Sequence, residues 1–344
     1  MDESRIKKVQ QQLDVDCLLI DDPVDLFYLT GLTLSIGRMA LFPDRASLFV
    51  DGRYIEIGKK KAPCEVKLNQ EFVSYLSSAQ KVGFDSAFLS CDDFAKLEKQ
   101  LPQKKWVPLS KPLKEMRAVK EGREIETLKK AARLTWEGFL HIRSLLKEGI
   151  SESELALEFE FFCRRKGASA LSFSPIIAFG ENSAFPHHRA GNTKLKKNQI
   201  ALFDLGAVVD GYAGDMTRVI FFGEADPELQ KDYQLIQQAQ ALAIDAIRPG
   251  VQFGELDRIA REYLRKAGVA DLFTHGLSHG IGLETHEFPF LRIEGGDRET
   301  ELTPGMVFTV EPGLYRPARG GVRYEDTVLV TKTGAENFFP SDNG

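Results

Sequence analysis

The sequence has few cysteines, and none of them are paired by spacing. Cys17, Cys64, Cys91 and Cys163 lie far apart, and no C-x-x-C motif occurs in the 344 residues. This spacing argues against a zinc ribbon and against a disulfide framework. Cys17 and Cys163 stand beside apolar residues, which is typical of buried thiols in a reducing compartment. We therefore expect a cytoplasmic protein.

The sequence also lacks long apolar runs and an excess of positive charge. No stretch approaches the roughly 20 apolar residues that cross a bilayer, and the first 16 residues lack the apolar centre of a secretory signal. The net charge is −5, and basic runs such as Lys59–Lys61 are short. We therefore expect neither a membrane protein nor a nucleic-acid-binding protein.

The chain is long enough for two domains, and its pattern changes near residue 115. Strand-like and helix-like patterns alternate before that point. The strand-like runs are 17–20, 41–50 and 81–84, and the helix-like runs are 4–13, 54–61 and 91–100. A segment with two prolines and several lysines follows at 106–120, and a long helical pattern begins near Glu121. We expect an N-terminal α/β domain at residues 1–115, for assembly or for shaping a cleft, and a second domain at residues 116–344.

The second domain contains an internal repeat. Segments 145–155 and 246–256 align without a gap at an offset of 101 residues, and Gly167 matches Gly268 at the same offset. Each copy predicts a helix, a turn with glycine, and a second helix that ends at a glycine suited to a left-handed cap. Ser151 and Glu154 form a predicted capping box. Chance similarity between amphipathic helices is the alternative to a duplication, which would place two sheets around a pseudo-twofold axis with a cleft between them.

A hairpin is predicted within residues 199–222. Asp210-Gly211 lies between two apolar runs and is typical of a two-residue type I′ turn. Such a turn pairs Val209 with Tyr212, and the apolar flanks on both faces are typical of a covered sheet.

The same hairpin places two aspartates side by side. Counting back from the turn puts Gly206 opposite Asp215, and Asp204 then lies diagonal to Asp215 on the same face, roughly 7–8 Å away. Two buried carboxylates repel each other and lose their hydration, and a divalent cation removes that cost. The pair therefore predicts a metal site, whereas an exposed hairpin with solvated aspartates is the alternative.

Two glutamates follow predicted strands further along the chain. Glu311 comes directly after a predicted strand at 306–310, and Arg323 and Glu325 share one face of a predicted strand at 322–330. Each glutamate alone could be exposed on an edge strand. Together with the aspartates they give four carboxylates, which with one imidazole suit two hard divalent ions.

Histidines supply the imidazole. Five of the six histidines fall in two short segments: His187, His188, His275, His279 and His286. The i, i+4 pair His275 and His279 could bind zinc on a helix, but the intervening and following glycines favour a loop, and H-E-x-x-H is absent.

These motifs resemble the pita-bread metallopeptidases, which include methionine aminopeptidase, aminopeptidase P and prolidase. The similarity rests on aspartates eleven residues apart, S-H-G-x-G at 278–282, E-P-G at 311–313 and R-x-E-D at 323–326. It covers roughly residues 121–332, and an N-terminal α/β domain is typical of the proline-specific branch. The resemblance implies an α/β (α+β) protein with a creatinase-like N-terminal domain and a C-terminal pita-bread domain built by pseudo-twofold duplication.

The resemblance also implies roles for individual residues. The implied metal ligands are Asp204, Asp215, His279, Glu311 and Glu325. The implied catalytic residues are His187, His275, His286, Glu311 and Arg323. The implied cofactor is a pair of divalent ions, with manganese favoured and cobalt or zinc left open. His188 departs from the family pattern beside His187, so either of the two could point inward.

The implied activity is metal-dependent release of the first residue from small peptides with proline second, by hydroxide formed between the two ions. We expect an Xaa-Pro aminopeptidase, with an Xaa-Pro dipeptidase as the alternative and a silent binding protein as a remote one. A strict dipeptidase must bind the proline carboxylate, normally with an arginine. No spacing singles one out among the candidates Arg189, Arg292, Arg316 and Arg319. The family's habit predicts a homodimer.

Overall fold

The computed structural model describes residues 4–224 and 226–340. The chain divides into two compact units, Met1–Glu115 and Met116–Gly344. The outer ends of the two expected domains, residues 1–3 and 341–344, lie outside the described residues. Each unit mixes helices and strands, as the sequence pattern predicts. No helix in the described ranges combines the length and the apolar character needed to cross a membrane.

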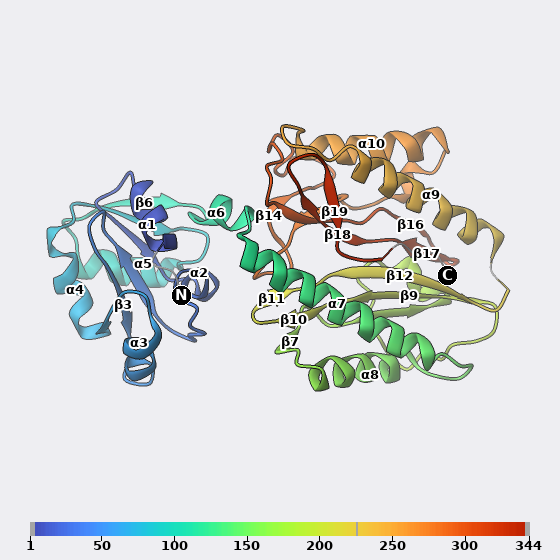
Figure 1. The fold of residues 1–344 in the computed structure, drawn as a ribbon, viewed down its shortest axis with the longest axis horizontal. Coiled ribbons are helices and arrows are strands. Elements are labelled where there is room, and N and C mark those ends of the chain that lie inside the picture. The colour runs from blue at the N-terminus through green and yellow to red at the C-terminus, as the bar shows by residue number, and fades with distance from the viewer. Residues whose placement is uncertain (1–3, 225, 341–344) are drawn as a thin grey trace. The chain divides into compact units, whose positions relative to one another are not determined.

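The first unit is built on a six-stranded mixed sheet with the order β4-β3-β2-β1-β5-β6 (Figure 1). Its strands are β1 (Cys17–Ile20), β2 (Arg38–Leu41), β3 (Ala46–Val50), β4 (Glu65–Leu68), β5 (Lys81–Asp85) and β6 (Lys105–Leu109). Its helices are α1 (Ser4–Gln11), α2 (Pro23–Thr30), α3 (Ile55–Lys61), α4 (Phe72–Tyr75) and α5 (Cys91–Gln100). The single strand predicted at 41–50 is wrong, because the chain reverses there and forms the β2–β3 hairpin. Pro43 lies in that turn, and the Phe42 amide donates to the Arg45 carbonyl across it (2.8 Å).

The second unit contains four long helices and several small sheets. Its helices are α7 (Gly122–Ser144), α8 (Glu152–Arg165), α9 (Pro227–Asp245) and α10 (Phe253–Lys266), and the short α6 (Lys114–Ala118) crosses the boundary between the units. Its strands are β7 (Ala170–Leu171), β8 (Ile176–Phe179), β9 (Gln199–Leu205), β10 (Ala207–Val209), β11 (Tyr212–Ala213), β12 (Met216–Phe222), β13 (His279–Gly280), β14 (Glu287–Phe290), β15 (Val307–Val310), β16 (Gly313–Arg316), β17 (Gly320–Arg323), β18 (Asp326–Val330) and β19 (Ala335–Asn337). The sheet orders are β12-β9-β8, β11-β10-β7, β14-β13-β15-β18-β19 and β16-β17.

The two helix pairs show the predicted repeat. Gly149 and Gly250, which precede α8 and α10, both have φ of 86°, and Gly167 and Gly268, which follow these helices, have φ of 104° and 76°. The left-handed conformation predicted for the helix ends is therefore confirmed, as is the capping box of Ser151 on α8. Helices α7 and α8 share one apolar core with β9, whereas α9 and α10 share another with β15 and β18. Figure 1 shows the two pairs on opposite sides of the strands.

The predicted hairpin is also confirmed. Val209 pairs with Tyr212, and Asp210 and Gly211 both have positive φ, at 49° and 87°. The same register continues into β9 and β12, where Asp204 faces Thr217, so Asp204 and Asp215 are diagonal neighbours.

The strand predicted at 322–330 is wrong in one respect. The chain leaves one sheet after Arg323, at the end of β17, and enters another at the start of β18. Glu325 lies between the two strands, and its amide donates to the Thr217 carbonyl at 3.2 Å. Tertiary pairing with β12 therefore interrupts a segment whose local pattern favours a continuous strand.

A buried ion cluster ties the start of the second unit to β14. Glu287 accepts a hydrogen bond from Lys120 Nζ at 2.8 Å and another from Arg117 Nη2 at 2.7 Å. Burial alone would raise the pKa of the Glu287 carboxyl, but the charges of Lys120 and Arg117 outweigh it and hold that pKa below its ordinary value.

Replacing Glu287 by Gln should destabilise the protein by about 3–5 kcal/mol at neutral pH, because two buried cations lose their shared carboxylate. Since the pKa of Glu287 is depressed by folding, its contribution is present above the unfolded-state pKa and disappears as the pH falls through the folded one. Urea unfolding at pH 7 and at acid pH measures both effects, and the gap between wild type and variant should shrink in acid. Glu284 also pairs with Arg117 but is 35% exposed, so Glu284→Gln is the matched control and should change stability little. Equal losses in both variants would contradict the assignment.

Candidate metal centre

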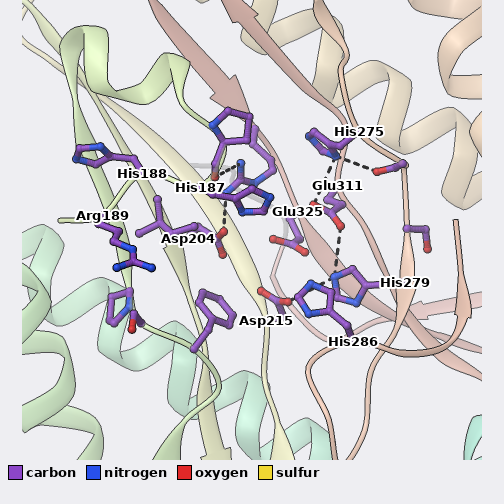
Figure 2. A pocket seen from close by; sticks show the side chains of 18 of the residues that line it. His187, His188, Arg189, Asp204, Asp215, His275, His279, His286, Glu311 and Glu325 are labelled. Atoms are coloured by element: carbon purple, nitrogen blue, oxygen red, sulfur yellow. Dashed lines mark hydrogen bonds and ion pairs between the residues drawn. The ribbon is translucent and has the colours of Figure 1, made fainter. Parts of the chain in front are cut away.

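Strand ends from both halves of the second unit meet at one pocket. Asp204 lies on β9, Asp215 precedes β12, His279 begins β13, Glu311 follows β15, and Glu325 separates β17 from β18. The pocket has a volume of about 710 Å³, within the range of about 300–1,000 Å³ that is usual for small-molecule sites. Every site residue predicted from the sequence lines it: Asp204, Asp215, His187, His188, His275, His279, His286, Glu311, Arg323 and Glu325 (Figure 2).

The carboxylates of this pocket form a buried cluster of like charge. Burial, followed by the charges of neighbouring carboxylates, raises the pKa values of Asp215 and Glu311 well above their ordinary range. Burial and the charge of Asp204 raise the pKa of Glu325 to about 8. Asp204 Oδ2 accepts a hydrogen bond from Arg323, but the buried Oδ1 has no hydrogen-bond partner among the described residues. Such a cluster is costly unless a cation compensates it.

His279 presents a lone pair to the carboxylates. Burial, with a smaller contribution from His286, lowers the pKa of His279 to about 3, so its ring is neutral. Its Nδ1 lies 3.1 Å from the Gly280 carbonyl, which accepts the ring hydrogen and leaves Nε2 unprotonated. Nε2 lies 3.3 Å from Glu311 Oε1 and 3.7 Å from Asp215 Oδ2. An unprotonated ring nitrogen that faces carboxylate oxygens in this way is suited to share a cation with them.

The donor set therefore fits divalent metal. Ligand atoms of Asp215, His279 and Glu325 all lie within 4.8 Å of one another. Glu311 contacts His279, and Asp204 contributes an unsatisfied buried oxygen. Carboxylate oxygens with one imidazole are ligands that manganese and similar divalent ions accept.

A chain of hydrogen bonds surrounds this cluster. Arg323 Nη1 donates to the Tyr315 hydroxyl at 2.8 Å, and that hydroxyl lies 2.9 Å from His275 Nε2. Burial raises the pKa of Tyr315 to about 12, so the hydroxyl keeps its hydrogen and donates to His275. His275 Nδ1 in turn lies 2.9 Å from the Gly276 carbonyl. Both ring nitrogens of His275 thus have partners within the protein.

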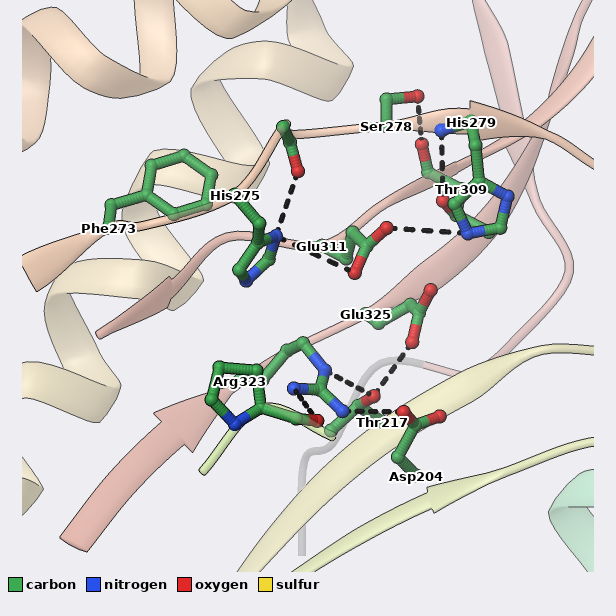
Figure 3. A network of polar contacts seen from close by, with 12 residues as sticks. Asp204, Thr217, Phe273, His275, Ser278, His279, Thr309, Glu311, Arg323 and Glu325 are labelled. Atoms are coloured by element: carbon green, nitrogen blue, oxygen red, sulfur yellow. Dashed lines mark hydrogen bonds and ion pairs between the residues drawn. The ribbon is translucent and has the colours of Figure 1, made fainter. Parts of the chain in front are cut away.

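Arg323 also orients two carboxylates. Figure 3 shows its side chain contacting Asp204 and Thr217, and Thr217 reaches Glu325. Arg323 Nε lies 3.1 Å from Thr217 Oγ1, and that hydroxyl donates to Glu325 Oε2 at 2.7 Å. Burial would lower the pKa of Arg323, but the nearby Tyr315 and carboxylates outweigh it, so the guanidinium stays charged.

The two adjacent histidines differ in their surroundings. His188 Nε2 lies 2.9 Å from Glu152 Oε2, whereas the exposed ring of His187 has no hydrogen-bond partner among the described residues. Figure 2 shows His187 pointing toward the carboxylates and His188 lying farther from them. Of the two, His187 is therefore the one available to a ligand.

Sequence reasoning missed three residues that support the site. Thr217 and Tyr315 hold Arg323, and Glu152 holds His188. The sequence does indicate Thr217, because this residue stands two positions after Asp215 and therefore lies on the same face of the strand. Nothing in the sequence indicates the role of Glu152, since an acidic residue in the first turn of a helix usually interacts only with the helix dipole.

Both units of the chain are similar to known protein families. Residues 126–332 match metallopeptidase family M24, and residues 4–119 match the Creatinase/Prolidase N-terminal domain. The Xaa-Pro dipeptidase of Pyrococcus furiosus is 34% identical over 341 residues, which cover 97% of each chain. The structure of an Xaa-Pro dipeptidase from Bacillus anthracis has a TM-score of 0.94 and 32% identity, over 99% of this chain and 97% of that one. The X-Pro aminopeptidase of Thermotoga maritima gives a TM-score of 0.89 at 28% identity, over 98% and 99%. These matches confirm the predicted creatinase-like and pita-bread domains.

Proposed function

The chain belongs to metallopeptidase family M24, and from this premise we propose that it is an Xaa-Pro dipeptidase, which hydrolyses the bond before a C-terminal proline. Family membership makes it a metal-dependent peptidase rather than a silent binding protein. The observation that carries the proposal is the similarity to Xaa-Pro dipeptidases along nearly the whole chain, in both domains. The aminopeptidase activity expected from the sequence has less support, because the T. maritima aminopeptidase is less similar in sequence and structure than the B. anthracis dipeptidase.

The proposed metal ligands are Asp204, Asp215, His279, Glu311 and Glu325. Bound divalent ions would lower the pKa of a water and polarise the scissile carbonyl. The unsatisfied Asp204 oxygen and the unprotonated His279 nitrogen support these assignments. Manganese as the native metal, the homodimer and the cytoplasmic location stay predictions.

The protein's own residues supply proton transfer and orientation. Glu311 would accept a proton from the attacking water at its carboxylate and deliver it to the proline nitrogen. His187 and His286 would donate hydrogen bonds to the developing oxyanion. Burial lowers the pKa of His286, so its ring is a neutral donor. His275, whose nitrogens are both engaged, would act through Tyr315 and Arg323 by fixing the position of Asp204.

A matched pair of peptides tests the proposed function. An Xaa-Pro dipeptide should be cleaved readily with metal bound, and a tetrapeptide that begins with the same two residues should be cleaved far more slowly. Release of the first residue, followed by chromatography, gives kcat/KM for both. Equal or faster cleavage of the tetrapeptide would replace this proposal with the aminopeptidase activity.

A further inference from the structure

A fully buried ion pair lies behind the strand that carries Thr217. Arg218 follows Thr217 on β12, and because side chains alternate along a strand, it points to the opposite face. The Arg218 side chain is 0% exposed, and its Nη2 donates to Asp326 Oδ1 at 2.6 Å. Neither residue lines the pocket, so neither contacts a substrate bound there.

An ion pair at such depth contributes little net stability. Removing two charges from water costs about as much free energy as their attraction returns, and well-packed apolar side chains of similar volume are often as stable or more so. Fixing the register of neighbouring segments is the best attested role of a buried pair. The contacts of Arg218 and Asp326 with their neighbours show which segments these are.

Arg218 holds the backbone of Glu325. Its Nη1 donates to the Glu325 carbonyl at 2.7 Å and to the Thr217 carbonyl at 2.9 Å. The Glu325 amide donates to the same Thr217 carbonyl at 3.2 Å, and the Glu325 carboxylate accepts from the Thr217 hydroxyl at 2.7 Å (Figure 3). Glu325 lies in the break between β17 and β18, where its bridge to Thr217 is isolated. These contacts therefore replace the continuous strand pairing that would otherwise fix residue 325.

Asp326 extends the same network to the segment that carries Glu311. Its Oδ2 accepts from Gln240 Nε2 on α9 at 3.2 Å and from Asn337 Nδ2 on β19 at 2.7 Å. Gln240 Nε2 also donates to the carbonyl of Val310, the residue before Glu311, at 3.1 Å. One polar network thus contacts the backbone at Glu325 and directly before Glu311.

Tyr324 makes a second link between the two segments. The guanidinium carbon of Arg218 lies 4.3 Å from the centroid of the Tyr324 ring, whose negative face attracts a cation. The Tyr324 amide donates to the carbonyl of Pro312, the residue after Glu311, at 3.2 Å. The carbonyls on both sides of Glu311 are therefore tied to the segment that carries Glu325.

A carboxylate suits position 326 because it accepts hydrogen bonds on both oxygens. Arg218 donates to one oxygen, and the side-chain amides of Gln240 and Asn337 donate to the other. An asparagine at this position has one accepting oxygen and one donating NH₂ group. In either orientation of its amide, that NH₂ group would face a donor.

We propose that Arg218 and Asp326 are positioning residues that set the spacing of Glu311 and Glu325 and so raise the affinity of the site for divalent metal. This inference rests on the proposed function, in which both glutamates are metal ligands. Residues that orient metal ligands from behind typically contribute about 10- to 100-fold to metal affinity.

The test is calorimetric titration of Mn²⁺ into metal-stripped protein, with wild type compared with the double variant Arg218→Met/Asp326→Leu. The double variant leaves neither charge unpaired and should keep the fold, because apolar side chains of similar volume replace the pair. Its dissociation constant for Mn²⁺ should be about 10- to 100-fold higher than that of wild type. Asp326→Asn should also weaken Mn²⁺ binding. Arg218→Lys should bind more tightly than the double variant, because lysine keeps the charge and loses the planar fork.

Asp232→Asn is the matched control. Asp232 is a buried aspartate on α9 that pairs with Arg316 at 2.6 Å, and neither of these residues lines the pocket. The control removes a buried, arginine-paired carboxylate as Asp326→Asn does. Its melting temperature should fall, whereas its Mn²⁺ affinity should equal that of wild type.

The outcomes separate this inference from the function beneath it. Circular dichroism and thermal melts establish that each variant is folded at the temperature of the titration. Wild-type Mn²⁺ affinity in the folded double variant, or in folded Asp326→Asn, would show that the pair serves stability alone and would refute its positioning role. An equal loss of affinity in Asp232→Asn would refute that role as well, because Asp232 has no described contact beside a ligand. If wild type itself binds no divalent ion, the metal centre and the proposed function fail instead.

Discussion

Stripping the divalent ions with a chelator should abolish peptide hydrolysis, and added Mn²⁺ should restore more of it than Co²⁺ or Zn²⁺. The described side chains that line the pocket offer no strong activator of water of their own. His279 is neutral with its lone pair turned to Glu311 and Asp215. The pKa values of Glu311 and Asp215 are raised by burial and then by the charges of Glu325 and Asp204. Without a cation, burial and neighbouring charge favour the protonated forms of these carboxyls, and a protonated carboxyl cannot take a proton from water. Hydrolysis of an Xaa-Pro dipeptide before and after chelation, with each metal added back, measures the effect.

The control for chelation is the same chelator saturated with Mn²⁺, which should leave activity intact. Circular dichroism of the stripped protein shows whether the fold survives, so that loss of activity is not mistaken for unfolding. Full activity in folded protein whose metal content is zero by mass spectrometry would end the two-metal interpretation.

Parts of the site could be predicted because local sequence determines them. Asp210-Gly211 determines the turn, the turn determines the register, and the register places Asp204 diagonal to Asp215. Gly149 and Gly250 adopt left-handed conformations that few other residues tolerate, so their spacing reveals the repeat. In both cases a few residues determine the backbone without help from distant segments.

Other parts depend on contacts between distant segments and left no local pattern. The break between β17 and β18 arises because Glu325 pairs with Thr217, 108 residues away. Glu152 holds His188 only because α8 packs against β8. The four arginines look alike in the sequence. In the structure, Arg316 and Arg319 pair with Asp232 and Asp226, which come from α9 or its N-terminal cap. Arg189 lines the pocket, and Arg292 is not among its lining residues.

Replacing Asp215 by Asn should lower kcat/KM by about three or more orders of magnitude. This loss is larger than the roughly 10²–10³-fold loss of rate that follows removal of a single oxyanion donor. Asp215 is buried, and a ligand atom of its side chain lies within 4.8 Å of ligand atoms of His279 and Glu325. A neutral amide cannot compensate metal charge as a carboxylate does. Metal content should fall with activity, whereas His286→Ala should lose turnover and keep its metal. A variant with the metal content of wild type would contradict the assignment of Asp215 as a ligand.

The Asp215→Asn variant should be more stable than wild type once both proteins are free of metal. Burial, and then Glu325 and Asp204, raise the pKa of Asp215 in the folded state. For a carboxyl with a raised folded pKa, stability is fully present below the unfolded pKa of about 3.9 and is lost as pH rises through the folded one. Asn has no proton to lose, so thermal melts of the stripped proteins should favour the variant at pH 8 and converge near pH 4. Asp210→Asn is the matched control: Asp210 is exposed in the turn of the same hairpin, and Asn-Gly suits that turn equally well. It should keep wild-type metal content, activity and pH dependence. A stripped Asp215→Asn variant less stable than wild type at pH 8 would show that the carboxyl is held by contacts that outweigh its repulsion.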